Sequence, residues 1–371
     1  MSDVAAVPFL DLSSQYRELE SEWLQAIRAA GNSGAFILGP NVTAFEKEFA
    51  ERVGAKHAIG CANGTDALVL SLRALDVGPG DEVITVPFTF FASAETATLV
   101  GAKVVFADIE ADTYNIDPKG IEKLITPKTK AIVPVHLYGC PARMDEIMAI
   151  ARKHKLVVVE DCAQAFSATV GDKRVGAIGD AGTFSFYPTK VLGCYGDGGM
   201  VTTNRDDVAE RLRRLRNHGQ VATYLHNEAG YNSRLDEIQA ALLRLKLRHI
   251  ERDIVGRETV AAEYAQRLAG SGAIVPQRPA YGRHVFGVYT VRVKNRDTVR
   301  KVLADNKIAS AVYYPVPLHL QDVYKSLGYQ PGSMPVSEQV SHDVLSLPIY
   351  PGMPLAKVAR VAQVLTAALK S

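Results

Sequence analysis

The sequence predicts an α/β fold: a large domain with a mostly parallel sheet covered by helices on both faces, followed by a smaller C-terminal α+β domain. Short apolar, β-prone segments alternate with helix-like segments from about residue 56 to residue 205. Strands that alternate with helices build parallel units covered on both faces. The chain has 371 residues, which is enough to bury a large core and to carry a second domain.

The large domain is predicted from its side-chain patterns. Leu68, Leu72 and Leu75 recur at helical spacing, and residues 156–159 form the continuous apolar run that is typical of a buried parallel strand. The expected strands are residues 56–61, 82–86, 103–107, 131–135, 156–159, 183–186 and 200–203.

The second half of the chain predicts a different arrangement. Residues 236–250 form a long helical pattern, and a further helix is expected from residue 258 onward. A strand at residues 285–293 and a helix at residues 297–305 complete a compact α+β unit. We therefore predict a large domain over residues 15–250 and a small domain over residues 251–371, with residues 1–14 packed against the small domain.

Composition excludes several classes of protein. The net charge of +2 gives no reason to expect a nucleic-acid partner, and the one dense basic cluster, residues 211–216, alternates with leucines as an amphipathic helix does. No segment is long and apolar enough to span a membrane, and the N-terminus lacks the pattern of a secretory leader. The four scattered cysteines show no metal-ligand spacing and suit a reducing compartment, so we expect a cytoplasmic protein without a metal site.

Lys190 is the most informative candidate for chemistry. It lies between the β-prone residues 183–186 and a loop that contains Gly193, Gly196, Gly198 and Gly199. Glycines let the backbone approach a ligand closely, and a partly desolvated lysine there is a candidate for Schiff-base formation. Asp161 ends the predicted buried strand 156–161. A lysine amine for the aldehyde and a carboxylate for the ring nitrogen are what pyridoxal phosphate requires.

Further polar residues fall at the predicted strand ends, where folds of this class hold ligands. Gly64 and Thr65 open the first strong helix, so their amides can hold a phosphate or simply form a turn and an N-cap. Ser185 alternates with two phenylalanines and is either a phosphate contact or a core hydroxyl. Asp161 can instead cap the segment that follows it, and Gln164 either reaches the cofactor ring or lies at the surface.

Taken together, the motifs resemble the DegT-type nucleotide-sugar aminotransferases, pyridoxal-phosphate enzymes of the aspartate-aminotransferase fold (fold type I), over nearly the full chain. The segments that carry this resemblance are residues 36–40, 62–67, 87–90, 160–164, 185–190, 196–199, 232–239 and 313–319.

The resemblance implies a role for each candidate residue. Lys190 is expected to form the Schiff base, and Asp161 to partner the pyridine nitrogen. Gln164 is expected to contact the ring hydroxyl. The expected phosphate contacts are Gly64, Thr65 and Ser185. Phe90 is expected to stack on the ring, although core packing beside Phe88 and Phe91 is a second interpretation of that position.

Asn232 is expected, by the same resemblance, to reach the cofactor phosphate of a neighbouring subunit, which implies a homodimer with shared sites. Without the family it would be interpreted as an N-cap ahead of Asp236. The sequence departs from many relatives at Phe166, where they carry histidine, and this puts in doubt a polar contact from that position.

The implied activity is amino transfer from L-glutamate to a keto-sugar nucleotide, with pyridoxamine phosphate as the aminated form of the cofactor. A dehydrating branch of the family carries histidine in place of the lysine, so Lys190 favours transfer. Gln164 resembles the branch that acts on 3-keto sugars, including a 3-keto uronate, and a 4-keto sugar is the alternative.

Arg234 is the expected clamp for a substrate carboxylate, or else forms an ion pair with Asp236. Tyr313 and Tyr314 are expected to line the sugar site, with an aromatic core pair as the other interpretation. His218 and His319 receive no role. A regulatory protein that keeps the fold without turnover is a competing hypothesis. A dinucleotide-dependent dehydrogenase is disfavoured, because the glycine-rich fingerprint GxGxxG is missing.

Overall fold

A computed structural model describes residues 5–370 of the chain. Its helices are α1 (Leu12–Ser33), α2 (Pro40–Val53), α3 (Gly64–Ala74), α4 (Ala92–Leu99), α5 (Pro118–Ile121), α6 (Met144–His154), α7 (Asp206–Leu215), α8 (Glu237–Leu247), α9 (Ile250–Arg267), α10 (Arg296–Asp305), α11 (Pro335–Asp343) and α12 (Leu355–Ala368). Short 3₁₀ turns are η1 (Glu122–Leu124), η2 (Leu137–Gly139), η3 (Leu318–Leu320) and η4 (Asp322–Leu327).

The strands are β1 (His57–Cys61), β2 (Glu82–Thr85), β3 (Lys103–Phe106), β4 (Thr129–Ile132), β5 (Val157–Asp161), β6 (Thr169–Val170), β7 (Lys173–Arg174), β8 (Ala181–Ser185), β9 (Gly199–Thr203), β10 (Gln220–Ala222), β11 (Leu225–His226), β12 (Gly282–Arg283), β13 (Tyr289–Arg292) and β14 (Val344–Leu347).

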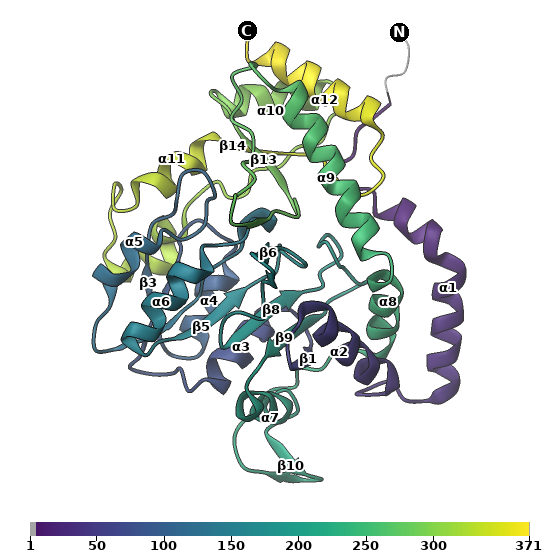
Figure 1. The fold of residues 1–371 in the computed structure, drawn as a ribbon, viewed down its shortest axis with the longest axis vertical. Helices are drawn as coiled ribbons and strands as arrows, with labels where there is room; N and C mark the ends of the chain where they lie inside the picture. Colours follow the sequence, from purple (N-terminus) through teal and green to yellow (C-terminus); the bar gives the residue numbers. More distant parts are fainter. Residues whose placement is uncertain (1–4, 371) are drawn as a thin grey trace.

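A seven-stranded, mostly parallel sheet forms the centre of the molecule, as the sequence predicts (Figure 1). Its order is β1-β9-β8-β5-β4-β2-β3, and β9 alone runs antiparallel to both of its neighbours. The strands β8, β5, β4, β2 and β3 are parallel, so their carboxyl ends meet at one edge. Ligands bind at that edge in open α/β sheets.

Both faces of the sheet are buried, which explains why its strands are continuous apolar runs. Val158 packs into a core with α2, α6 and α8, whereas its neighbour Val159 packs into a second core with α3, α4 and α7. Ile132 and Ala131 divide between the two cores in the same way. This alternation follows from the two-residue period of a strand. The predicted α/β architecture is therefore confirmed.

A third core lies in the C-terminal part, where β13 and β14 pair beside α9, α10 and α12. Val7 belongs to this core and bridges to Ile308, whereas residues 1–4 of the predicted N-terminal segment lie outside the described residues. Residues 318, 324 and 334 pack instead on the core around α3 and α4. The boundary near residue 250 coincides with the start of α9 and stays a prediction.

Several predicted elements differ in extent; the strand expected over residues 131–135, for example, lies at Thr129–Ile132. The apolar segment 285–293 forms a strand only at Tyr289–Arg292, because the backbone amides of Val285 and Val288 instead donate to the carbonyls of Gly139 and Tyr138. The helix expected over residues 236–250 ends at Leu247, and α9 begins at Ile250. Within residues 5–370, no helix combines the length and the apolar character that crossing a membrane would require.

Candidate active site

A cavity of about 820 Å³ opens at the carboxyl edge of the parallel strands. This volume lies within the range of roughly 300–1,000 Å³ that is usual for small-molecule sites. Most of the residues that the sequence singles out line it: Gly64, Thr65, Phe90, Asp161, Gln164, Ser185, Lys190, Tyr313 and Tyr314. The fold thus brings together side chains that are up to 250 positions apart in the chain.

Lys190 supplies the single lysine amine among the described residues of this cavity. Its amine forms no hydrogen bond or ion pair with any residue in the range 5–370. Desolvation lowers the pKa of the Lys190 amine, and the negative charge of Asp161 opposes that shift only in part. A larger fraction of the amine is therefore unprotonated near neutral pH, which is the form that attacks an aldehyde.

Asp161 lies at the end of β5 and is 6% exposed. One carboxylate oxygen, Oδ1, accepts a hydrogen bond from the backbone amide of Ala163 at 3.1 Å. The other, Oδ2, accepts one from the hydroxyl of Ser93 at 2.7 Å. The local capping expected as an alternative role does occur, yet the carboxylate also lines the cavity and stays available to a ring nitrogen.

Gln164 bridges two parts of the cavity wall instead of lying at the surface. Its side-chain oxygen accepts from the amide of Tyr138 at 2.8 Å, and its side-chain nitrogen donates to the hydroxyl of Tyr314 at 3.0 Å. The hydroxyl of Tyr138 donates to the carbonyl of Tyr313. Burial raises the pKa of Tyr314, so its phenol stays neutral and can donate a hydrogen bond.

A cradle for a phosphate lies where α3 begins. Asn63 caps this helix by accepting from the amide of Asp66 at 2.8 Å. The amides of Gly64 and Thr65 donate to no acceptor within the described chain, and they point from the positive end of the helix dipole. A Cβ added at Gly64 would lie 2.6 Å from the Cβ of Ser185, so only glycine allows this approach. An anion therefore finds free donors beside the Ser185 hydroxyl.

The aromatic residues of the segment 88–91 divide their roles. Phe90 is 58% exposed and lines the cavity, whereas Phe88 is fully buried. Core packing is thus the role of Phe88, and Phe90 offers a bare ring face to a flat ligand. Phe166, where many relatives carry histidine, is buried and stacks on Phe49 with ring centroids 5.0 Å apart. It makes no polar contact because it is a core residue.

Asn232 and Arg234 do not line the cavity of their own chain. Asn232 caps no helix, since α8 begins after Asp236. Arg234 forms no ion pair with Asp236; its guanidinium donates to the side-chain oxygens of Asn217 at 3.0 Å and Asn232 at 2.6 Å. The alternative interpretations of both residues are therefore not realised, and their predicted roles require a second chain.

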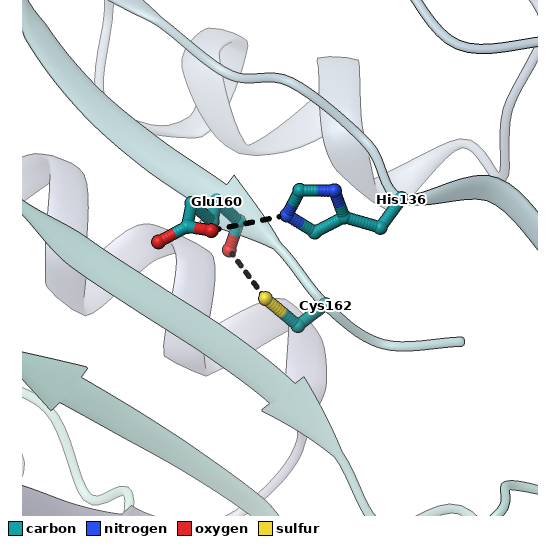
Figure 2. A group of neighbouring side chains, drawn as sticks. All are labelled: His136, Glu160 and Cys162. Carbon is teal, nitrogen blue, oxygen red and sulfur yellow. Dashed lines mark hydrogen bonds and ion pairs between the residues drawn. The ribbon is translucent and has the colours of Figure 1, made fainter. Parts of the chain in front are cut away.

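Glu160, next to Asp161, forms a buried cluster with His136 and Cys162 (Figure 2). The carboxylate accepts from the backbone amides of Gly176, Ile178 and Gly179 and lies 3.1 Å from Nε2 of His136. Because Nδ1 of His136 accepts from an amide at residue 142, Nε2 carries the proton and donates to Glu160. The ring nitrogens and the carboxylate are thus satisfied within the protein, and the cluster fixes the end of β5 from the face opposite Asp161.

Residues 17–366 match the DegT/DnrJ/EryC1/StrS aminotransferase family, which covers nearly the whole chain. The chain belongs to this family. It is a pyridoxal-phosphate-dependent sugar aminotransferase, as the sequence motifs predict.

Three similar proteins carry different functional names. A Geobacillus stearothermophilus protein named "Pleiotropic regulatory protein" is 50% identical over 93% of this chain and 94% of its own length. An Acidithiobacillus ferrooxidans UDP-N-acetyl-3-dehydro-alpha-D-glucosamine 3-aminotransferase is 46% identical over 98% of each chain. A Pseudomonas aeruginosa UDP-2-acetamido-2-deoxy-3-oxo-D-glucuronate aminotransferase is 43% identical over 97% of this chain and 99% of its own.

The fold agrees with a solved member of the family. The crystal structure of S. venezuelae DesV, determined in complex with a ketimine intermediate, superposes with a TM-score of 0.96 at 43% identity. The alignment covers 99% of each chain. The described residues fit the cofactor of this family: a desolvated amine, a buried carboxylate, a bare aromatic face and a cradle of free amides surround one cavity.

Sequence reasoning missed several residues in and behind the cavity wall. Tyr138 and Ser93 donate hydrogen bonds to Gln164 and Asp161, and Thr89 lines the cavity within hydrogen-bond distance of Ser93. Ser93 lies 68 positions from Asp161, and no local pattern links the two. Tyr187 and Thr189 also line the cavity. Their position just before Lys190 is the one signal that would have found them.

Proposed function

We propose that this chain transfers an amino group from L-glutamate to a 3-keto sugar carried on a nucleotide, with a 3-keto uronate among its candidate substrates. The observation that carries the proposal is that the desolvated amine of Lys190 and the buried carboxylate of Asp161 line one cavity of about 820 Å³ and interact electrostatically. The names of two relatives that act on 3-keto sugars support the position of amination.

Each site residue has a chemical task in this proposal. The bound cofactor supplies an electron sink for the bond that is broken at the amino donor. Lys190 Nζ removes and returns the proton at the donor's α-carbon, a role that typically contributes about 10²–10⁴-fold in rate. Asp161 holds a proton on the ring nitrogen by charge pairing. Gln164, supported by Tyr138 and Tyr314, orients the ring hydroxyl, and Phe90 covers the ring face.

A substrate screen tests the proposal. Purified protein is incubated with glutamate and a panel of nucleotide-linked 3-keto and 4-keto sugars, including a uronate, and 2-oxoglutarate is measured. Mass spectrometry and NMR then locate the new amine. We expect amination at C3. An amine at C4 would replace the 3-keto assignment with the 4-keto alternative and leave the reaction class unchanged.

The regulatory hypothesis is tested separately, because a 50% identical relative carries a regulatory name. Holoprotein is mixed with glutamate alone in a single-turnover experiment. We expect the yellow absorbance of the Lys190-bound cofactor to disappear while one equivalent of 2-oxoglutarate forms. An unchanged spectrum would favour a sensor that binds the cofactor without turnover.

We also propose that the active unit is a homodimer in which each cavity is completed by the partner chain. Four acids, Asp66, Glu95, Asp161 and Asp197, line the described cavity, and Lys190 is the one cation there. A nucleotide diphosphate is strongly anionic, so a cavity with this charge balance needs cations from elsewhere. Arg234 lies outside its own cavity and has no carboxylate partner within residues 5–370.

Exposed apolar side chains support such an interface. The β10–β11 hairpin projects from the body beyond α7 (Figure 1) and exposes Val221, Tyr224 and Leu225. The segment Phe36–Leu38 exposes three further apolar side chains. Large apolar groups that a monomer leaves bare are typical of surfaces that a second chain covers.

Mixed dimers of Lys190→Ala and Asn232→Ala test the sharing directly. If Asn232 serves the partner's cavity, each mixed dimer contains one site with both native residues. Mixing the two defective proteins should then restore turnover toward half of the wild-type value per dimer. Activity that stays at the sum of the two separate variants would show that each chain builds its own site.

Arg234 is expected to decide whether a carboxylated sugar is accepted. For Arg234→Ala, kcat/KM with a 3-keto uronate should fall about 10- to 100-fold, since a charge-assisted bidentate contact is lost. The same variant with the uncharged 3-keto sugar is the matched control and should change by less than about threefold. Equal losses on both substrates would assign Arg234 to the fold or the diphosphate.

We further propose a cytoplasmic location. All four cysteines are free and buried, which is the state that thiols keep in a reducing compartment. Recovery of the native protein in the periplasmic or extracellular fraction of its source cells would contradict this assignment.

A further inference from the structure

The buried hydroxyl groups of Ser93 and Thr89 form a chain of hydrogen bonds that ends at the carboxylate of Asp161. Ser93, on α4, is 1% exposed, and Thr89, in the segment between β2 and α4, is 2% exposed. The hydroxyl of Ser93 lies 2.7 Å from Oδ2 of Asp161, and the hydroxyl of Thr89 lies 3.0 Å from that of Ser93. Ser93 lies outside the motifs that carry the family resemblance, and Thr89, inside the segment 87–90, received no role there.

The direction of these hydrogen bonds is fixed by counting protons. An ionised carboxylate only accepts, so the one hydroxyl proton of Ser93 is directed at Asp161. The hydroxyl of Thr89 must then donate its proton to the oxygen of Ser93. All of the donors therefore point toward the carboxylate, and hydrogen bonds in such a chain polarise one another.

This chain of hydrogen bonds also fixes which lone pairs of the carboxylate remain free. Oδ2 is held by Ser93 and Oδ1 by the amide of Ala163, so the carboxylate cannot rotate without losing both bonds. The Asp161 side chain so held lines the cavity. Thr89 directly precedes Phe90, and one segment thus sets both the acid and the aromatic face that would enclose the ring.

We propose that Ser93, with Thr89 behind it, is a positioning residue that holds the Asp161 carboxylate aimed at the cofactor ring nitrogen. The proposal rests on the role proposed above for Asp161. A buried carboxylate without hydrogen-bond partners is costly, and the proton donated by Ser93 offsets that cost. Titratable neighbours that interact with Asp161 are Lys190, Tyr314 and Cys162.

The test compares Ser93→Ala, Thr89→Val and Asp161→Asn as reconstituted holoproteins. The first readout is the pH titration of the absorbance of cofactor bound through Lys190. A positive charge on the ring nitrogen disfavours a second positive charge at the lysine nitrogen. Loss of the ring charge therefore raises the apparent pKa of that titration. We expect the apparent pKa to rise most in Asp161→Asn. It should rise less in Ser93→Ala and least in Thr89→Val.

The second readout separates positioning from folding. Ser93→Ala should lower kcat with glutamate about 10- to 100-fold with little change in KM, as loss of a hydrogen bond to a charged group predicts. Ser93→Thr, which keeps the hydroxyl, should recover most of the loss. Thr96→Val is the matched control, since Thr96 lies on the same helix, is fully buried and has no hydrogen-bond partner for its hydroxyl. Thr96→Val should leave the pH titration of the cofactor absorbance unchanged.

The outcomes distinguish the two proposals. If Asp161→Asn shifts the titration and Ser93→Ala does not, the inference about Ser93 is wrong while the role of Asp161 stands. If Asp161→Asn itself leaves the titration and the turnover unchanged, the proposed role of Asp161 fails, and the inference fails with it. Equal shifts in Ser93→Ala and Thr96→Val would reduce Ser93 to a packing residue.

Discussion

Lys190→Ala should abolish repeated turnover while leaving the fold intact. The variant loses the group that we propose holds the cofactor covalently and moves the proton, so we expect kcat to fall by at least about 10²–10⁴-fold. Cofactor should still bind through the phosphate cradle at Gly64, Thr65 and Ser185 but without its yellow absorbance. Rapid-scan spectroscopy and a glutamate-dependent assay of 2-oxoglutarate measure both effects.

Two controls make this result specific. Lys190→Arg keeps a long cationic side chain but stays protonated, so it should be as inactive as the alanine variant. Because the Lys190 amine makes no hydrogen bond or ion pair to the described residues, the apoprotein of Lys190→Ala should melt within a few degrees of wild type. Normal multiple turnover by either variant would refute the assignment.

Asp161→Asn should have the second largest effect. The substitution keeps the size of the side chain and an oxygen that can accept from Ser93, but it removes the charge that we propose pairs with the ring nitrogen. Removing one electrostatic partner from a poorly solvated site typically costs about 10²–10³-fold in kcat. We expect a loss of that size in the glutamate half-reaction, measured under single-turnover conditions.

Asp161→Ala provides the comparison. It should lose activity to a similar degree, and it should also lose stability by about 1–3 kcal/mol, because the Ser93 hydroxyl and the Ala163 amide are left without an acceptor in a buried site. Chemical denaturation of the apoproteins measures the loss of stability separately from the loss of activity. Activity close to wild type in the asparagine variant would mean that another group partners the ring.

Local signals in the sequence were sufficient for much of the fold. The apolar run 156–159 predicts a buried strand because consecutive valines are tolerated only where both faces of a sheet are covered, and the two cores around Val158 and Val159 confirm it. Asn63 and Gly64 mark the start of α3 because a side-chain cap and a close backbone approach are properties of adjacent residues.

Other features were not predictable from local patterns. Residues 285–288 are as apolar as a strand, yet they form a loop. The backbone amides of this loop donate to carbonyls of η2. Phe166 was left in doubt as a polar contact, and its stacking on Phe49 shows that it is a core residue. In both cases the partner lies far away in the chain, and no spacing rule reports it.

The sequence by itself determined the family and the candidate residues for its chemistry, because a lysine among glycines and an acid at a strand end are recognisable from their immediate neighbours. The tertiary structure alone decided how that acid is held: Ser93 on α4 donates to it with Thr89 behind, and Glu160 anchors the opposite face through His136 and the loop 176–179. The physical reason is that the carboxyl ends of parallel strands converge only after the sheet has formed. Hydrogen bonds between residues tens of positions apart then leave no periodic trace in the sequence.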